Sequence, residues 1–199
     1  AALHVSGAAT YVDDIPEPQN LVHVAPGYAR DAARGRIVSL DLDPVRAAPG
    51  VVAVLTARDV PGKNDCSPSI GDDPILAEET ISFHGQVIFA VAAETREQAR
   101  RAARLAKIEI AAEPPAVSVD DAIGMAVPDV LPPYAFERGD VAKALARAPR
   151  KIEESFLVGG QEHFYLEGQV SLAVPEEGGA MTVHCSTQHP TEVQHIVAH

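Results

Sequence analysis

The clearest folding signal in the sequence is QVIFAVAAETREQARRAARLAKIEI, residues 86–110. Its first seven residues, 86–92, are mostly apolar and predict a strand. Thr95 and Gln98 follow in the S/T-x-x-E/Q pattern that caps the start of a helix. Alanines then recur at helical spacing and predict a helix that packs closely on a sheet: Ala99, Ala102, Ala103 and Ala106. Residues 107–110 alternate in polarity and predict a return strand, which completes a β-α-β unit.

The residues before this unit predict a mixture of strands and short helices. Residues 51–55, VVAVL, are continuously apolar and predict a buried strand. Pro44 suits the first position of a short helix that Pro49 ends. Residues 61–74 are rich in Pro, Gly, Ser and Asp, which is typical of a loop. Two further strands are predicted over 21–25 and 36–40.

Prolines are concentrated between Glu113 and Pro133, where a short helix fits over 119–125. We therefore predict a linker over residues 114–133. It connects a first domain, residues 1–113, to a second domain, residues 134–199.

The second domain is predicted to contain two helices and three strands. Asp140 suits the cap of a helix that ends before Pro149. The strands are predicted over 152–158, 169–174 and 181–186, with a turn at 176–179 between the last two. Pro190 begins a helical pattern that runs to His199 without the glycine, asparagine or basic turn that usually ends a helix. We therefore expect the chain to be cut from a longer polypeptide.

Composition excludes several functional classes. The chain has 199 residues, 46% of them hydrophobic and 5% aromatic, which suits a globular protein with an aliphatic core. Its formal net charge of −12 argues against a nucleic-acid partner, because such binding depends on Lys and Arg that neutralise phosphates. No apolar run approaches the ~20 residues of a membrane-spanning helix.

The two cysteines and the N-terminus point to a cytoplasmic protein. Cys66 and Cys185 form no CxxC pair. They are too few for an iron–sulfur cluster, which needs about four thiolates, and reduced thiols are the default in the cytosol. The first residues lack the basic start and apolar stretch of a signal peptide.

Ordinary catalytic motifs are missing from the sequence, which has no GxGxxG, GxxxxGK[ST] or GxSxG pattern. His195 and His199 stand four residues apart, but Ile196 replaces the glutamate of the zinc-protease pattern, so we interpret the spacing as chance. His163 is a candidate general base, although a packing role is favoured. Three acidic pairs are interpreted as solvated turns: Asp13–Asp14, Asp72–Asp73 and Asp120–Asp121.

Two polar stretches in the second half carry the strongest functional signal. GGQEHFYLE, residues 159–167, has adjacent glycines that can bring the main chain close to a ligand. From its residues alone, it is a polar loop that enters the strand predicted over 169–174. The other stretch is CSTQHPTEVQH, residues 185–195.

Together these stretches closely resemble segments of xanthine dehydrogenases and related aldehyde oxidases, in which the first stretch approaches the molybdenum centre. Three more landmarks are similar, so the resemblance covers essentially the whole chain: SGAATYVDDIP at 6–16, PGVV at 49–52 and DVPG at 59–62. The resemblance implies an α+β fold. An α/β hammerhead domain over 1–113 would precede the truncated start of a mixed α/β molybdopterin-binding domain over 134–199.

The resemblance also implies chemistry. In such enzymes a molybdenum–molybdopterin centre hydroxylates an electron-poor carbon with oxygen from water. The electrons leave through [2Fe–2S] clusters to FAD and NAD. We expect these electron carriers on a partner domain or subunit, which the hammerhead domain would contact, and we expect a homo-oligomer.

Within the loop, Gln161 matches the glutamine whose amide hydrogen-bonds an oxygen ligand of molybdenum. A neutral amide donates there without adding charge. Gly160, with Gly159, would allow the close approach. We expect the loop to be anchored from behind by Glu162, His163 and Glu167. The catalytic base is expected beyond His199, so we expect this chain to carry no catalytic residue, to be inactive and to hold no cofactor tightly.

Three functions remain open. The first is water-derived hydroxylation of hypoxanthine and xanthine to urate in purine catabolism. It is favoured by the sequences QEHFYLE at 161–167 and QHP at 188–190. The second is another molybdenum hydroxylase that resembles aldehyde oxidase. The third is a non-catalytic module that docks the Fe–S/FAD partner. Assays with xanthine and with an aldehyde distinguish the first two, and native mass spectrometry with the partner tests the third.

Overall fold

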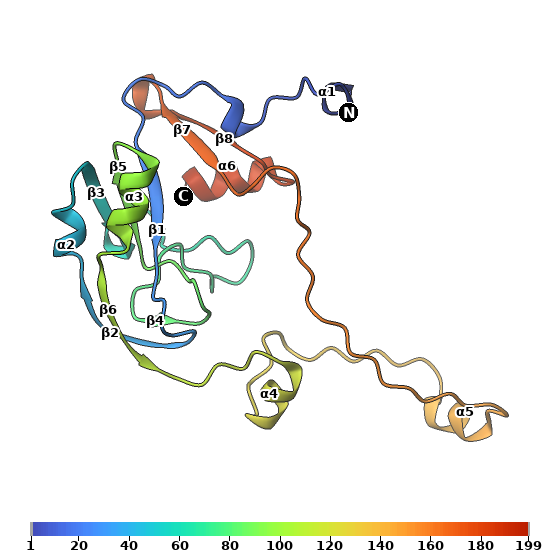
Figure 1. The fold of residues 1–199 in the computed structure, drawn as a ribbon. Coiled ribbons are helices and arrows are strands. Elements are labelled where there is room, and N and C mark those ends of the chain that lie inside the picture. Colours follow the sequence, from blue (N-terminus) through green and yellow to red (C-terminus); the bar gives the residue numbers. More distant parts are fainter. Residues whose placement is uncertain (1, 199) are drawn as a thin grey trace. The chain divides into compact units, whose positions relative to one another are not determined.

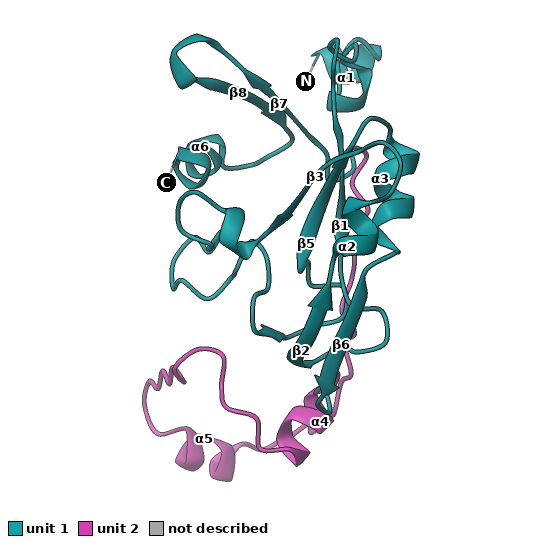
Figure 2. Ribbon diagram, turned by 90° about the vertical axis from the view of Figure 1, so that its left-hand side faces the viewer, with its two compact units in different colours: residues 1–115, 167–199 teal, residues 116–166 magenta. Residues whose placement is uncertain are grey.

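The computed structural model describes residues 2–198, which mix helices and antiparallel sheets and confirm the α+β class (Figure 1). The chain divides into two compact units, residues 1–115 with 167–199 and residues 116–166 (Figure 2). The domain boundaries predicted above stay a prediction. None of the described helices is long and apolar enough to cross a membrane.

The first unit contains most of the regular elements. In chain order they are α1 (Ala2–Ser6), the 3₁₀ helix η1 (Val12–Asp14), β1 (His23–Gly27), β2 (Gly35–Asp41), α2 (Asp43–Arg46), β3 (Val51–Thr56), the 3₁₀ helix η2 (Ala57–Asp59), β4 (Thr80–Ile81), β5 (Phe89–Ala93), α3 (Arg96–Ala103), β6 (Lys107–Ala112), β7 (Ser171–Pro175), the 3₁₀ helix η3 (Glu177–Gly179), β8 (Met181–Cys185) and α6 (Pro190–Ala198). The second unit contains α4 (Val119–Gly124) and α5 (Val141–Arg147).

A three-stranded antiparallel sheet, in the order β1-β5-β3, holds the most buried strand of the first unit. In the central strand β5, the side chains of Phe89, Val91 and Ala93 are fully buried. Val91 lies opposite Ala25 of β1 on one side and Val54 of β3 on the other. A strand that is paired on both edges and covered on both faces needs a continuous apolar sequence, which β5 has.

Helix α3 follows β5 and packs against both β5 and β1. Its cap is confirmed, because Thr95 Oγ1 accepts a hydrogen bond from Gln98 N at 3.2 Å. Ala99 and Ala102 are buried, as the alanine spacing predicts. The helix ends before Ala106, which instead packs as a partly buried residue at the core.

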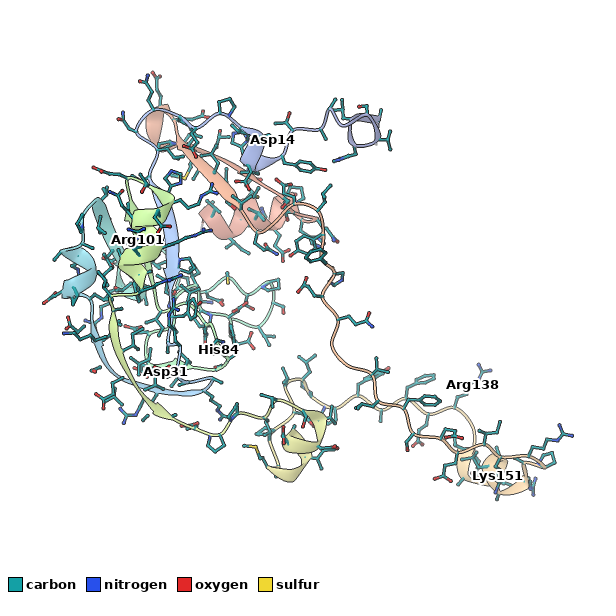
Figure 3. All side chains as sticks on the ribbon, viewed as in Figure 1. Asp14, Asp31, His84, Arg101, Arg138 and Lys151 are labelled. Carbon is teal, nitrogen blue, oxygen red and sulfur yellow. The ribbon has the colours of Figure 1, made fainter. Side chains whose placement is uncertain are left out.

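The outer face of α3 is charged. Arg101 forms an ion pair with Glu97 one turn earlier (Figure 3). Arg96, at the start of the helix, lies 3.7 Å from Asp13 of η1. Both pairs are exposed to solvent, so each adds little stability.

The β-α-β unit predicted around α3 is wrong in its pairing, although the order of its elements is confirmed. Strand β6 does not join β5; it pairs with β2 in a second antiparallel sheet, β4-β2-β6, with Ile110 opposite Ile37. The register shifts between Ile37 and Ser39. Local periodicity predicts a strand but does not identify its partner, and here both strands next to α3 pair with strands far away in the sequence.

Two further predictions in the first half need correction. Strand β3 is not buried, because it is an edge strand whose Val52 and Leu55 side chains are 61% and 44% exposed. Strand β5 begins at Phe89 rather than at Gln86, whose buried side chain accepts a hydrogen bond from Ser82 N at 2.7 Å. The sequence patterns also missed the short elements α1, η1, η2 and β4. The other strands, the helix at Pro44 and the loop over 61–74 are confirmed, with small shifts at their ends.

The end of the chain forms a hairpin and a helix. Strands β7 and β8 pair antiparallel around η3, with Ala173 opposite Val183, which confirms the two strands and the turn between them. Gly178 and Gly179 both have positive φ, a conformation that glycine adopts readily. The helix predicted from Pro190 is confirmed as α6.

The second unit contains helices and irregular chain. Helix α4 is confirmed, and so is α5, which Asp140 caps by accepting a hydrogen bond from Lys143 N at 2.8 Å. The strand predicted over 152–158 is wrong, because these residues have no regular structure. A strand needs a partner for its backbone N–H and C=O groups, and no described strand pairs with this stretch.

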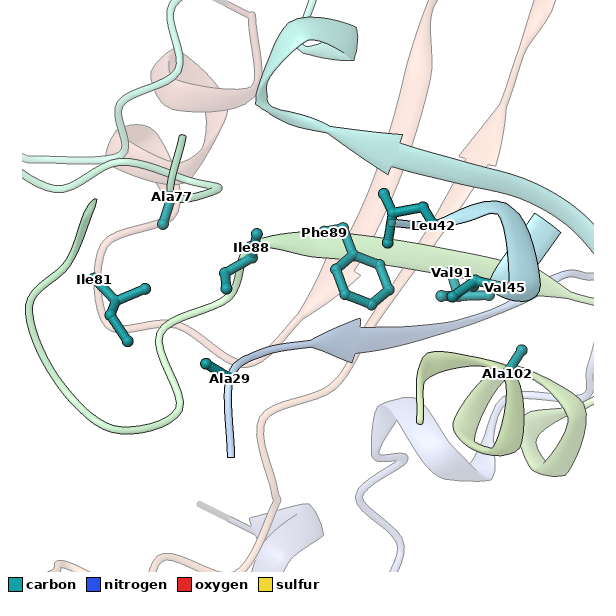
Figure 4. Close-up of a cluster of buried hydrophobic side chains, with 9 residues drawn as sticks. All are labelled: Ala29, Leu42, Val45, Ala77, Ile81, Ile88, Phe89, Val91 and Ala102. Carbon is teal, nitrogen blue, oxygen red and sulfur yellow. The ribbon is translucent and has the colours of Figure 1, made fainter. Parts of the chain in front are cut away.

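The core of the first unit is small and aliphatic. Phe89 of β5 lies at its centre in Figure 4, surrounded by residues from β4, β5, α2 and α3 and from the loops that adjoin these elements and β1. The buried members are Ala29, Leu42, Val45, Ala77, Ile81, Ile88, Phe89, Val91 and Ala102. Gly27 of β1 lies against the Phe89 ring, so closely that a Cβ atom at residue 27 would overlap it.

Gly27→Ala is therefore expected to lower the free energy of unfolding by roughly 1–3 kcal/mol, because the fully buried ring has no room to move aside. Urea or thermal unfolding measures the change. Gly124→Ala is the matched control, because a Cβ there meets nothing within 4 Å at the end of α4. The control is expected to keep or raise stability by up to about 1 kcal/mol. Equal losses in both variants would contradict this description of the core.

Candidate functional site

The loop over residues 159–167 lies in irregular chain between α5 and β7, drawn in orange in Figure 1. Every residue from 149 to 166 is exposed. The side-chain amide of Gln161 makes no hydrogen bond to any residue from 2 to 198. This amide is therefore able to donate to a group that is not part of the described chain.

The two glycines before Gln161 are not required by the fold of this chain. Neither Gly159 nor Gly160 has a positive φ, and a Cβ atom at either position would meet nothing within 4 Å. Gly35 of β2 differs in both respects, because its φ is +149° and a Cβ there would overlap the backbone of Ala111. Any steric need for glycine at 159 and 160 must come from outside the described residues.

Strain in the loop occurs at an aromatic residue. Phe164 has a φ of 48°, in the left-handed region that bulky side chains avoid, and its side chain is 92% exposed. Its backbone N–H donates to the Glu162 carboxylate at 3.4 Å, a long and exposed contact. The loop therefore makes a local turn that the packing of the chain does not enforce.

The three residues predicted to anchor the loop behave differently. Glu167 is partly buried, and its Oε1 accepts a hydrogen bond of 2.7 Å from the backbone N–H of Val12 in η1. Glu162 makes only the local contact to Phe164. His163 is exposed and has no hydrogen bond within the described chain. Of these three residues, Glu167 alone forms a hydrogen bond to a distant segment of the described chain.

The other titratable candidates have structural roles. Asp14 accepts a hydrogen bond from Tyr11 N at 3.0 Å (Figure 3), and Asp121 does the same for Ser118 N at 3.0 Å. Both are exposed, as predicted, but they lie in short helices rather than in turns: Asp14 ends η1, and Asp121 lies in the first turn of α4. His195 lies on α6, whereas its proposed neighbour His199 lies outside the described residues.

Both cysteines are free thiols. The Cys66 thiol donates to the Asp73 carbonyl at 3.3 Å. Burial, reinforced by the charge of Asp73, raises the pKa of this thiol above its usual value. A raised pKa leaves less thiolate at neutral pH, so Cys66 is a poor nucleophile.

A cavity of about 500 Å³ in the first unit lies between η1, β1, α3 and β7. Its lining includes the ion pair of Asp13 with Arg96 at 3.7 Å, and the carboxylate of Glu17, which lies 3.9 Å from the His23 ring nitrogen Nε2. Gln161 and Gly160 are not among its lining residues. The predicted site residues are therefore brought together only by their positions in one loop.

The residues present fit one contact to a molybdenum–pterin group. Gln161 offers a neutral donor with no partner inside the described chain, and Gly160 leaves space beside it. Within residues 2–198, no cluster of three His, Cys, Asp or Glu side chains is placed to hold a metal ion. The described chain thus offers an exposed amide donor rather than a set of metal ligands.

Comparison with known families gives two matches. Residues 6–114 match the family described as "Aldehyde oxidase and xanthine dehydrogenase, a/b hammerhead domain". Residues 126–199 match the "Molybdopterin cofactor-binding domain". The loop that carries Gln161 falls within the second match.

Individual proteins agree with these matches. A xanthine dehydrogenase of Dictyostelium discoideum is 39% identical over 195 residues, which is 98% of this chain and 14% of the relative. A probable aldehyde oxidase 1 of Oryza sativa subsp. japonica is 38% identical over 208 residues, which is 100% of this chain and 15% of the relative. This chain therefore spans about one-seventh of the length of these relatives.

A solved structure has the same fold. The aldehyde oxidoreductase of Desulfovibrio gigas superposes with a TM-score of 0.79 at 26% identity, over 91% of this chain and 22% of that one. The order of domains implied by the resemblance, a hammerhead domain before a molybdopterin-binding domain, is the order of the two family matches, of which the first ends at residue 114 and the second begins at residue 126.

Gly160→Ala is expected to change the free energy of unfolding of this chain by less than about 0.5 kcal/mol, because the new Cβ meets nothing within 4 Å. Gly35→Ala is the contrasting variant and is expected to be strongly destabilising, because it combines a positive φ with overlap of the Ala111 backbone. Urea unfolding of both variants checks the comparison. A large loss in Gly160→Ala would show that the glycine serves the fold of the chain itself.

Proposed function

Because the chain belongs to the aldehyde oxidase and xanthine dehydrogenase family, we propose that it forms part of the molybdenum site of a molybdenum hydroxylase. The observation that carries this proposal is the exposed amide of Gln161, unpaired within residues 2–198, in the part of the chain that matches the molybdopterin-binding family. When bound, the molybdenum–pterin group supplies a two-electron oxidation of an electron-poor carbon, with the new oxygen taken from water.

Gln161 has one role in this proposal. Its side-chain N–H donates a hydrogen bond to an oxygen atom of the bound group, and its neutrality leaves the charge of the site unchanged. Gly160 contributes by having no side chain, so the backbone before Gln161 can approach closely. The chain offers one contact of this kind, so we expect the isolated 199-residue chain neither to retain stoichiometric molybdenum nor to oxidise xanthine.

For the whole protein, we propose the hydroxylation of hypoxanthine and xanthine to urate, a step of purine catabolism. Electrons would pass to [2Fe–2S] clusters, FAD and NAD on a partner domain or subunit, in a cytoplasmic homo-oligomer. The relatives named xanthine dehydrogenase support this choice of substrate. The second candidate is aldehyde oxidation, which the likeness to an aldehyde oxidoreductase and a probable aldehyde oxidase supports.

The first test removes the proposed contact. In the protein expressed from its natural gene, Gln161→Ala is expected to lower kcat/KM for the preferred substrate at least about tenfold, because a hydrogen bond to a charged group contributes about 1.5–3 kcal/mol. Molybdenum content by mass spectrometry shows whether the loss comes from binding or from turnover.

Gln19→Ala serves as the matched control, because Gln19 is an exposed glutamine in the first unit, remote in sequence from the loop. It is expected to leave both measurements unchanged. Full molybdenum content together with full kcat/KM in Gln161→Ala would contradict the assigned role.

The second test addresses the substrate. The protein expressed from its natural gene is expected to show a higher kcat/KM for xanthine than for benzaldehyde, with NAD as electron acceptor. Steady-state assays under identical conditions compare the two substrates. A preference for the aldehyde would favour the second candidate and reject xanthine.

A further inference from the structure

We propose that Glu167 is a positioning residue, whose carboxylate fixes the end of the loop that carries Gln161 to the backbone of η1. This inference rests on the role proposed for Gln161. It concerns a different part of the loop, and a hydrogen bond that forms within the first unit.

Glu167 is the residue at which the chain becomes partly buried again. Every residue from 149 to 166 is exposed, and Glu167 is the first that is not. It is also the residue at which the chain re-enters the first unit (Figure 2). Its Oε1 lies 2.7 Å from the backbone nitrogen of Val12, a residue 155 positions away in the sequence. This bond thus lies where the chain returns to the first unit, shortly before β7.

The partner of Glu167 belongs to a turn that is held by its own hydrogen bonds. Tyr11 N donates to the Asp14 carboxylate at 3.0 Å, and Asp14 N donates to the Tyr11 carbonyl at 3.0 Å. Ile15 N donates to the Val12 carbonyl at 3.2 Å. The Val12 N–H has no acceptor within this turn and donates instead to the Glu167 carboxylate. The turn therefore presents a preformed donor, and a carboxylate is the stronger type of acceptor for it.

An anchor at residue 167 restricts Gln161 through the covalent chain. The two positions are six steps apart along the chain, so Gln161 can lie at most about 20 Å from the fixed end. The left-handed turn at Phe164 lies between them and shortens that reach. Loss of the anchor would let the amide sample a larger volume, and the fraction of time that it spends in any one position would fall.

The anchor itself is tested in the 199-residue chain by hydrogen exchange at the Val12 amide. Glu167→Ala is expected to raise its exchange rate at least about tenfold, because it removes a charge-assisted hydrogen bond. Glu167→Gln keeps an acceptor oxygen at the same place and is expected to restore part of the protection. The matched control is Glu177→Ala, an exposed glutamate of η3, which is expected to leave the rate unchanged. An unchanged rate in Glu167→Ala would overturn the proposal.

The consequence for Gln161 is tested in the protein expressed from its natural gene. Glu167→Ala is expected to lower kcat at least about threefold with little change in KM, and Glu167→Gln is expected to recover part of the loss. Val12→Pro provides an independent variant, because it deletes the donor at a position where proline fits: Tyr11 before it is extended, with φ −92° and ψ 167°, and Val12 begins a helical turn. Val12→Ala, which keeps the N–H, controls for the side chain.

A double variant tests whether Glu167 and Val12 act through the same hydrogen bond. If the two residues act through one hydrogen bond, adding Glu167→Ala to Val12→Pro gives no further loss of kcat. Additive losses would overturn the proposal, and so would normal kcat in a Glu167→Ala protein whose Val12 amide exchanges fast. If Gln161→Ala has full activity, the proposed function fails. If Gln161→Ala is impaired while Glu167→Ala is not, only the present inference fails.

Discussion

The first unit depends on the close packing of small side chains between α3 and the central strand β5. Ala99 of α3 meets Ala25 and Ala93 of the sheet in a cluster of three buried alanines. The chain has no tryptophan and only 5% aromatic residues, so large rings are not available to fill a wide gap between helix and sheet. Interiors are packed as densely as organic crystals, which requires the helix to lie close to the strands. Phe89 is the exception, and Gly27 provides the space for its ring.

In the second unit, an apolar segment that could form a strand remains irregular, because no described strand pairs with it. Residues 152–158 are as apolar as β7, yet Phe156 and Leu157 are 87% and 98% exposed. An apolar segment of this length can form a strand, but the strand forms only where backbone groups find acceptors and donors. Strand β7 has such a partner in β8, which follows it directly across the turn at η3, and the stretch before the loop has none among the described strands.

This difference explains which features the sequence predicts. Features that depend on residues within four positions of one another are confirmed. They are the caps at Thr95 and Asp140, the start of α6 at Pro190 and the turn between β7 and β8. The pairing of β6 with β2 and the edge position of β3 depend on residues far apart in the sequence, and periodicity gives no information about them.

The same limit applies to the candidate site. Gln161 was identified by resemblance, since its residue type and spacing alone indicate only a polar loop. The bond between Glu167 and Val12 spans 155 residues and uses a backbone donor, so no side-chain pattern could identify Val12. The sequence does contain both segments that resemble the family, residues 6–16 and 159–167. The hydrogen bond between them, from Val12 to Glu167, is visible only in the folded chain.

The amino-acid composition of the loop over residues 159–167 raises the free energy that is needed to order it. Two adjacent glycines increase the backbone entropy that ordering must remove, and Phe164 holds a left-handed conformation with its ring in water. Neither feature is compensated by packing within the described chain, since residues 159–166 are all exposed. Holding both ends of such a loop restricts the conformations that its backbone can sample. Glu167 holds one end through Val12, and a group bound by the Gln161 amide would hold the other. The two contacts together would explain why the chain keeps glycines and a strained Phe164 that its own fold does not require.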